Sequence, residues 1–151
     1  MKLKFFAAFA LVPATSLPAQ GAPDYTTAIP IGGTWNYAQT ADGSEATFVG
    51  ATNQPQLIVH CTRLSRRVSI AKPATAAAPF LAIWTSSQTR SAPASFNPLT
   101  NRLTTDFAAY DAFLDAIAFS RGRAAFNVGN APALVVPVWS EISRVIEDCR
   151  V

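Results

Sequence analysis

The chain has 151 residues, half of them hydrophobic, and it carries 12 basic and 9 acidic side chains. This length suits one domain with a single hydrophobic core. Lys2 and Lys4 lie in an N-terminal segment that we expect to be removed, which leaves 10 basic and 9 acidic groups and a net charge of about +1. Because this charge is small, we expect no nucleic-acid partner and no general attraction to an anionic membrane.

The first 21 residues have the three parts of a secretory signal peptide. Residues 1–4 carry two lysines, residues 5–12 form an uninterrupted apolar run, and small residues follow at Ala19 and Gly21. We expect cleavage after Gly21, with cleavage after Ala19 as the alternative. The apolar run is much shorter than the roughly 20 residues that span a bilayer. We therefore expect an exported protein with no integral membrane segment after cleavage, rather than an anchored one.

Residues 22–34 contain two prolines and the pair Gly32-Gly33, and are expected to be a lead-in to one β-rich domain over residues 35–151. Within that domain, short apolar or alternating runs separated by turn residues predict strands. The expected strands are 35–37, 45–50, 56–62, 68–70, 80–84, 94–96, 103–107, 124–128 and 133–136.

The strongest strand pattern is that of residues 56–62. Leu57, Val59 and Cys61 point to one face, while the polar or mixed residues between them point to the other. Asp42-Gly43 is a hairpin-type turn earlier in the chain. Residues 73–79 (PATAAAP) form a connector bounded by prolines, and we expect strand 94–96 to pair with strand 80–84.

Two short helices are expected late in the chain. Asp111 is a suitable cap for a helix over residues 111–119. A terminal helix is expected near residues 139–149, opened by Pro137 and Ser140. On a 3.6-residue wheel its apolar arc consists of Trp139, Ile142, Val145, Ile146 and Cys149.

Cys61 and Cys149 are the two cysteines of the chain. An exported protein enters an oxidising compartment, so we expect them to form a disulfide that joins the central strand to the terminal helix. Many short strands followed by one or two short helices predict a mainly β fold, either an antiparallel β-sandwich or a partly open barrel.

Several blocks of this sequence resemble known exported proteins. The layout resembles that of two kinds of small periplasmic β-sandwich protein, the invasion-associated locus B proteins and a periplasmic accessory family linked to type VI secretion. The shared features are Trp35, the segment PQLIVHC at 55–61, and the late strand, helix and final cysteine. Residues 111–129 and 137–150 more closely resemble an uncharacterised exported family of alphaproteobacteria. The resemblance covers residues 35–150 in outline and rests on structural positions. It implies a bacterial periplasmic or secreted β-sandwich, and it carries over no catalytic residues.

Catalytic and metal-binding patterns are weak in this chain. His60 is the only histidine. With both cysteines paired, a general base at this position would need a serine or threonine nucleophile and an orienting acid. We expect a surface or sheet-covered histidine instead. A structural metal site would need about four clustered Cys or His ligands, so we expect no metal and no cofactor. Asp106, Asp111 and Asp115 could supply paired carboxylates for glycoside hydrolysis, but helix capping already explains aspartate at a helix start.

The arginine clusters are the strongest candidates for a binding role. One turn carries Arg63, Arg66 and Arg67, and Arg121 and Arg123 flank Gly122. Guanidinium groups suit phosphates, acidic glycans and carboxylates, although arginine in a turn is usually only solvated. The three tryptophans, Trp35, Trp84 and Trp139, are interpreted as core residues.

Taken together, these patterns predict a monomeric or weakly associating exported domain that binds an unknown protein or an anionic ligand and is not an enzyme. The first alternative is a secreted inhibitor of a hydrolase, which a protruding, ordered loop with exposed apolar or arginine residues would favour. The second is a hydrolase, which a cleft joining Asp106, Asp111 and Asp115 would favour. A closed sandwich with shallow grooves would favour an adaptor.

Overall fold

The computed structural model describes residues 23–151, so the expected signal peptide over residues 1–21 lies outside the described residues. The first eight strands are β1 (Gly33–Gln39), β2 (Gly43–Gly50), β3 (Pro55–Thr62), β4 (Arg67–Pro73), β5 (Phe80–Trp84), β6 (Thr89–Pro93), β7 (Ser95–Asn97) and β8 (Arg102–Ala108). Helix α1 (Ala112–Ala118), strands β9 (Ala124–Asn127) and β10 (Leu134–Val136) and helix α2 (Ser140–Asp148) follow.

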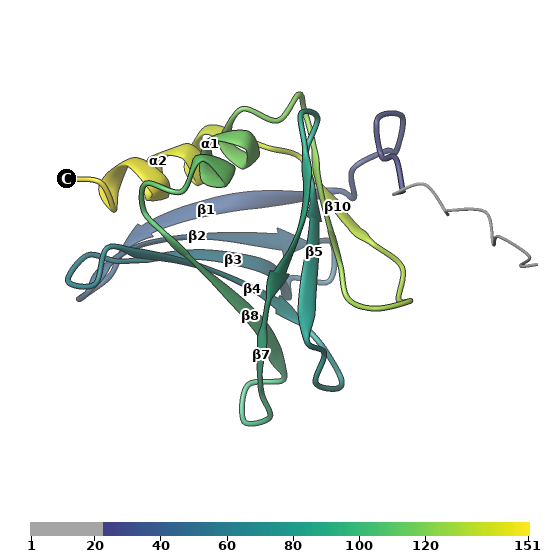
Figure 1. Ribbon diagram of the computed structural model, residues 1–151, viewed down its shortest axis with the longest axis horizontal. Helices are drawn as coiled ribbons and strands as arrows, with labels where there is room; N and C mark the ends of the chain where they lie inside the picture. The colour runs from purple at the N-terminus through teal and green to yellow at the C-terminus, as the bar shows by residue number, and fades with distance from the viewer. Residues whose placement is uncertain (1–22) are drawn as a thin grey trace, which may run out of the picture.

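The strands form two antiparallel sheets, which confirms the predicted mainly β sandwich. The larger sheet has the order β1-β2-β3-β4-β8-β7, and the smaller has the order β10-β9-β5-β6. Strands of the smaller sheet cross those of the larger at a steep angle, and both helices lie beside the smaller sheet, above the end of the larger one (Figure 1). The two sheets do not close into a barrel.

The chain changes sheets at a corner between β6 and β7. The backbone N–H of Ala94, the single residue between these strands, donates to the carbonyl of Pro79 at 3.0 Å. Close by, the Thr105 hydroxyl donates to the carbonyl of Pro93 at 2.8 Å. The predicted pairing of 94–96 with 80–84 is therefore wrong: β7 pairs with β8, and the neighbours of β5 are β6 and β9. Sequence analysis missed β6 because its segment, TRSAP, buries only Ala92.

The core lies between the larger sheet and the layer formed by the smaller sheet and the helices. The inward residues of β3 are Leu57, Val59 and Cys61, and all three are buried as predicted. Trp35 is also buried, 5.3 Å from the Phe48 ring centroid, and its indole N–H donates to the carbonyl of Pro137 at 2.8 Å. A buried indole needs such a partner, so this hydrogen bond ties β1 to the chain that enters α2.

Both predicted helices are present. Asp111 caps α1 by accepting a hydrogen bond from the Phe113 N–H at 2.9 Å. Helix α2 buries Ile142, Val145 and Ile146, but Trp139 is 43% exposed, so its placement in the core was wrong. The physical reason is that Trp139 is the N-cap, with extended backbone angles, and the helical wheel does not describe a residue outside the helix. No helix in residues 23–151 has the length and apolarity needed to cross a membrane.

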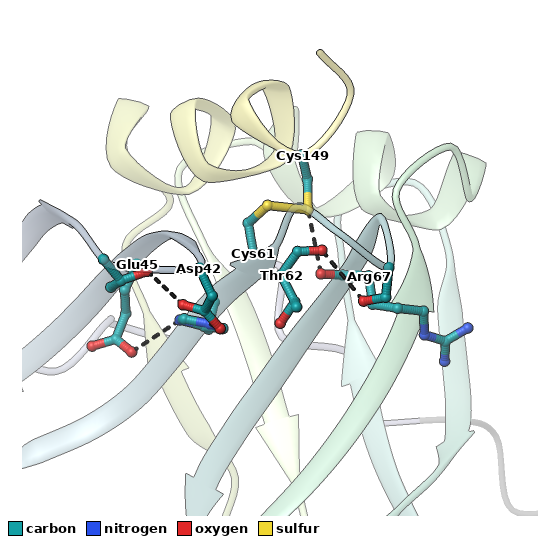
Figure 2. A network of polar contacts seen from close by, with 9 residues as sticks. Asp42, Glu45, Cys61, Thr62, Arg67 and Cys149 are labelled. Carbon is teal, nitrogen blue, oxygen red and sulfur yellow. Dashed lines mark hydrogen bonds and ion pairs between the residues drawn. A yellow bond between two sulfur atoms is a disulfide. The ribbon is translucent and has the colours of Figure 1, made fainter.

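The predicted disulfide between Cys61 and Cys149 is present, with the two Cα atoms 5.5 Å apart. It links the end of β3 to the residue that caps α2, as Figure 2 shows. Strand β2 approaches this bridge closely: a Cβ atom at Gly43 would lie 2.0 Å from the carbonyl oxygen of Cys61. Glycine is therefore required at position 43. The structure places Gly43 at the first residue of β2, and the turn itself is formed by residues 41–42, closed by hydrogen bonds between Thr40 and Gly43.

Candidate ligand-binding groove

The arginines of the predicted 63–67 cluster lie on the exposed turn between β3 and β4 and at the first residue of β4. Arg63, Arg66 and Arg67 are exposed, and none forms an ion pair within residues 23–151. The Arg67 side chain points away from the disulfide (Figure 2). Burial tends to raise the pKa of the Asp148 carboxyl group, but the hydrogen bond from the Tyr37 hydroxyl at 2.6 Å and the positive charges of Arg63 and Arg144 outweigh burial. The positive charge of Arg63 thus helps to lower the pKa of this carboxyl group.

The two arginines that flank Gly122, Arg121 and Arg123, have different surroundings. The Arg123 guanidinium donates to the carbonyl of Ala28 and so holds the lead-in segment against the start of β9. Arg121 is exposed, and its backbone N–H donates to the Ser86 hydroxyl at 2.9 Å. The structure therefore gives Arg123 a structural partner and leaves the Arg121 side chain in solvent.

The three aspartates of the predicted hydrolase site do not share a cleft, and two of them form ion pairs with different arginines. Asp111 pairs with Arg90 at 2.8 Å, Asp115 pairs with Arg150 at 2.8 Å, and Asp106 is exposed on β8. Desolvation tends to raise the pKa of Asp111, but the Phe113 N–H and the Arg90 guanidinium outweigh it and lower the pKa. A general acid needs the opposite shift, and a cavity beside Asp106 contains neither of the other two aspartates.

His60 lies on the outer face of the larger sheet, where it was predicted. Its Nε2 atom is 3.1 Å from Asp42 Oδ2 and its Nδ1 atom is 3.3 Å from Glu45 Oε2. Figure 2 shows the two carboxylates close to each other on neighbouring backbone. Because both ring nitrogens face carboxylates, neither is positioned to activate a hydroxyl nucleophile. Among residues 23–151, no three His, Cys, Asp or Glu side chains come together to hold a metal.

Four adjoining cavities instead define a surface that the sequence did not predict. The first, of about 420 Å³, lies between Lys72, the connector 74–78 and the turn 128–131. It shares Pro73, Ala74 and Thr75 with a second cavity of about 430 Å³ that reaches Asn101. We call these cavities, with the two described next, the connector groove.

The ends of the connector groove have different chemistry. At one end a polar cavity of about 280 Å³ is lined by Arg102, Gln54, Gln56 and neighbouring residues. At the other, beyond Gly129, a cavity of about 260 Å³ is lined by Trp84, Tyr25, Asn127 and small residues. Figure 1 shows that the turn before β10 and the loop that leads into β5 lie at the same end of the smaller sheet. The groove therefore runs around that end.

Lys72 and Arg102 are the cations of the connector groove. They come from neighbouring strands, with Pro73 paired to Arg102 and Lys72 paired to the buried Leu103. The Lys72 side chain therefore leaves the core-facing side of the larger sheet and the Arg102 side chain leaves its outer side. Neither forms an ion pair with a residue of the described chain, and no acidic side chain is among the described residues that line the four cavities. Lys72 is half-buried, and desolvation lowers its pKa. The Nη1 atom of Arg102 is buried without a hydrogen-bond acceptor in residues 23–151.

Trp84 lies on the outer face of β5, so its prediction as a core residue was wrong. Leu81 and Ile83 face the core, which directs Phe80, Ala82 and Trp84 outward. The Tyr25 ring meets the Trp84 indole edge-on, with centroids 5.9 Å apart. Because both faces of this short strand are apolar, periodicity could not show which one packs on the core.

Comparison of the chain with protein-family models, with curated proteins and with solved structures finds no match. The resemblance to exported alphaproteobacterial proteins therefore stays a prediction. Together these features describe a disulfide-linked antiparallel β-sandwich with adjoining cavities lined by Lys72 and by Arg102.

Proposed function

We propose that the protein is an exported, non-catalytic binding domain whose connector groove takes a ligand carrying a carboxylate or phosphate group. The observation that carries this proposal is Arg102, with Lys72 as a second cation in an adjoining cavity. Both cations line adjoining cavities, both lack an acidic partner in residues 23–151, and one guanidinium nitrogen is buried without an acceptor.

An anion beside Arg102 would satisfy its buried guanidinium nitrogen. Lys72 donates to the carbonyl of Pro73 at 3.4 Å and adds a positive charge in the adjoining cavity. A buried polar atom without a hydrogen-bond partner costs free energy, and native proteins contain few of them. The guanidinium fork matches the geometry of carboxylate and phosphate oxygens, while an ammonium group acts as a compact charge. Around Arg102 the amide side chains of Gln54, Gln56 and Asn101 offer further neutral donors. The cavity thus offers donors to an oxyanion and presents no carboxylate to repel it.

The inhibitor alternative would use the β3–β4 turn, where Leu64 is 99% exposed among arginines. This turn consists of residues 63–66 alone, between the end of β3 and the start of β4. It offers a partner less surface than the connector groove does. The groove is therefore the better-supported site.

Binding of inorganic phosphate and of succinate to the groove is expected to depend on its two cations. In calorimetric or NMR titrations at low salt, Arg102→Gln should weaken binding by about tenfold or more, since hydrogen bonds to charged groups contribute about 1.5–3 kcal/mol. Lys72→Gln should add to the loss, and raising the salt concentration should weaken binding of the unmodified protein.

Arg121→Gln is the matched control, because Arg121 is an exposed arginine outside the groove. It should bind both anions as the unmodified protein does. Equal affinities for Arg102→Gln and Arg121→Gln, or no binding of either anion by the unmodified protein at millimolar concentrations, would contradict an anion site in the groove.

Export is supported by two independent features, the three-part pattern of residues 1–21 and the disulfide between Cys61 and Cys149. Intact-mass measurement of the protein from the periplasmic or secreted fraction should give a chain that begins at Ala22 or, with the alternative cleavage, at Gln20. Recovery of the full-length chain from the membrane fraction would be incompatible with export by cleavage.

A further inference from the structure

We infer that the cavity lined by Trp84, Tyr25 and Asn127 is a binding site for one ring of a neutral sugar. This inference goes beyond the proposed function, because it stands on different residues and holds whether or not the groove binds anions. The cavity lies on the outer face of the smaller sheet and has a volume of about 260 Å³. It is therefore of a size for a small ligand or a single unit of a longer one.

The strand register places an aromatic platform beside an amide. Trp84 pairs with Ala125, and Ala82 pairs with Asn127, so Trp84 and Asn127 are diagonal neighbours on one face, close enough for long side chains to share a ligand. Ala82, Ala125 and Gly129 complete the floor and rim. These small residues leave the space beside the indole open.

The polar groups of this cavity favour a ligand that can form hydrogen bonds. Asn127 Oδ1 is buried without a partner in residues 23–151, and Thr89, paired with Trp84 across β5 and β6, brings a hydroxyl to the rim. A sugar hydroxyl both donates and accepts, so it satisfies either end of the amide. An aliphatic chain offers no such group and would leave the oxygen unpaired.

Charge argues for a neutral ligand at this end of the groove. None of the described residues that line the cavity is charged. Asp24, next to Tyr25 in the chain, is exposed and is not among the described lining residues. A pyranose combines an apolar C–H face for the indole with hydroxyl groups for Asn127 and Thr89.

Binding is tested with neutral tetrasaccharides of glucose and of N-acetylglucosamine, added to the protein with its disulfide intact. Two-dimensional NMR should show saturable shifts of the Trp84 indole N–H and the Asn127 side-chain amide with at least one of these sugars. Trp84→Leu and Asn127→Ala should each weaken that binding by at least about tenfold. Trp139→Leu removes an exposed tryptophan outside the cavity and should leave the affinity unchanged.

The variants also separate this site from the anion site. The double variant Lys72→Gln/Arg102→Gln should keep full sugar affinity, and Trp84→Leu should keep phosphate affinity. If neither sugar shifts the Trp84 and Asn127 signals, or if Trp84→Leu and Trp139→Leu bind equally well, the inference is overturned. Should Trp84→Leu fail to fold, the sugar affinity of Asn127→Ala and the NMR shifts of the unmodified protein test the inference. Unchanged sugar affinity in Asn127→Ala would also overturn the inference.

Discussion

Replacing Cys61 and Cys149 together by alanine is expected to lower the free energy of unfolding by about 4–5 kcal/mol in the chain-entropy model. The bond closes a loop of 88 residues in sequence separation, and without it the unfolded chain gains conformational freedom. Both cysteines are fully buried, so the pair of alanines avoids leaving an unpaired thiol in the core. For a domain of this size we expect the melting temperature to fall by roughly 10–15 °C.

The loss of stability in the variant without the disulfide is expected to appear first in α2. The disulfide joins the end of that helix to β3, whereas the opposite end of the helix is held by Trp35 through Pro137. Hydrogen exchange should therefore speed up in residues 140–148 more than in β2 and β3. An unfolding free energy within about 1 kcal/mol of that of the oxidised protein would show that the sandwich does not depend on the crosslink.

Phe48→Ala is expected to destabilise the protein by about 3–5 kcal/mol, measured by denaturant unfolding. The Phe48 side chain is fully buried and packs against Trp35. Its ring also fills the space above Gly33, where an added Cβ atom would lie 2.5 Å from Phe48 Cζ. Truncation at this position opens a cavity in the core and removes the contact with the indole.

Phe119→Ala is the matched control, because the Phe119 side chain is 77% exposed at the end of α1. We expect its effect to be within about 0.5 kcal/mol, as for other surface substitutions. If the two phenylalanine variants lost similar amounts of stability, the position of the core between the sheets would be in doubt.

Most of the fold could be predicted because it follows local rules. The alternation in residues 56–62 predicted both the strand β3 and its buried face, and Asp111 predicted the start of α1. The errors occur where the local rule does not apply. Trp139 was placed on a helical wheel although it lies just before the helix, and β6 has too few apolar residues to show a pattern.

The candidate site was far less accessible to sequence analysis. Lys72 and Arg102 are separated by a turn, a strand pair and a corner in which the chain changes sheets, yet the β4–β8 register places them at one end of the fold. The segment 73–79 was predicted only to be a connector, but its small residues line the groove. The arginines that were predicted as a site are either in solvent or engaged with backbone and a neighbouring carboxylate.

By itself, the sequence determined the mainly β class, the buried faces of the regular strands, the two helices and the pairing of Cys61 with Cys149. Each of these depends on periodicity, on capping or on the chemistry of two thiols. Only the tertiary structure decided that Trp84 faces outward and that Lys72 and Arg102 line adjoining cavities. These placements depend on strand register and on which sheet face is covered, and both are decided by contacts between residues far apart in the chain.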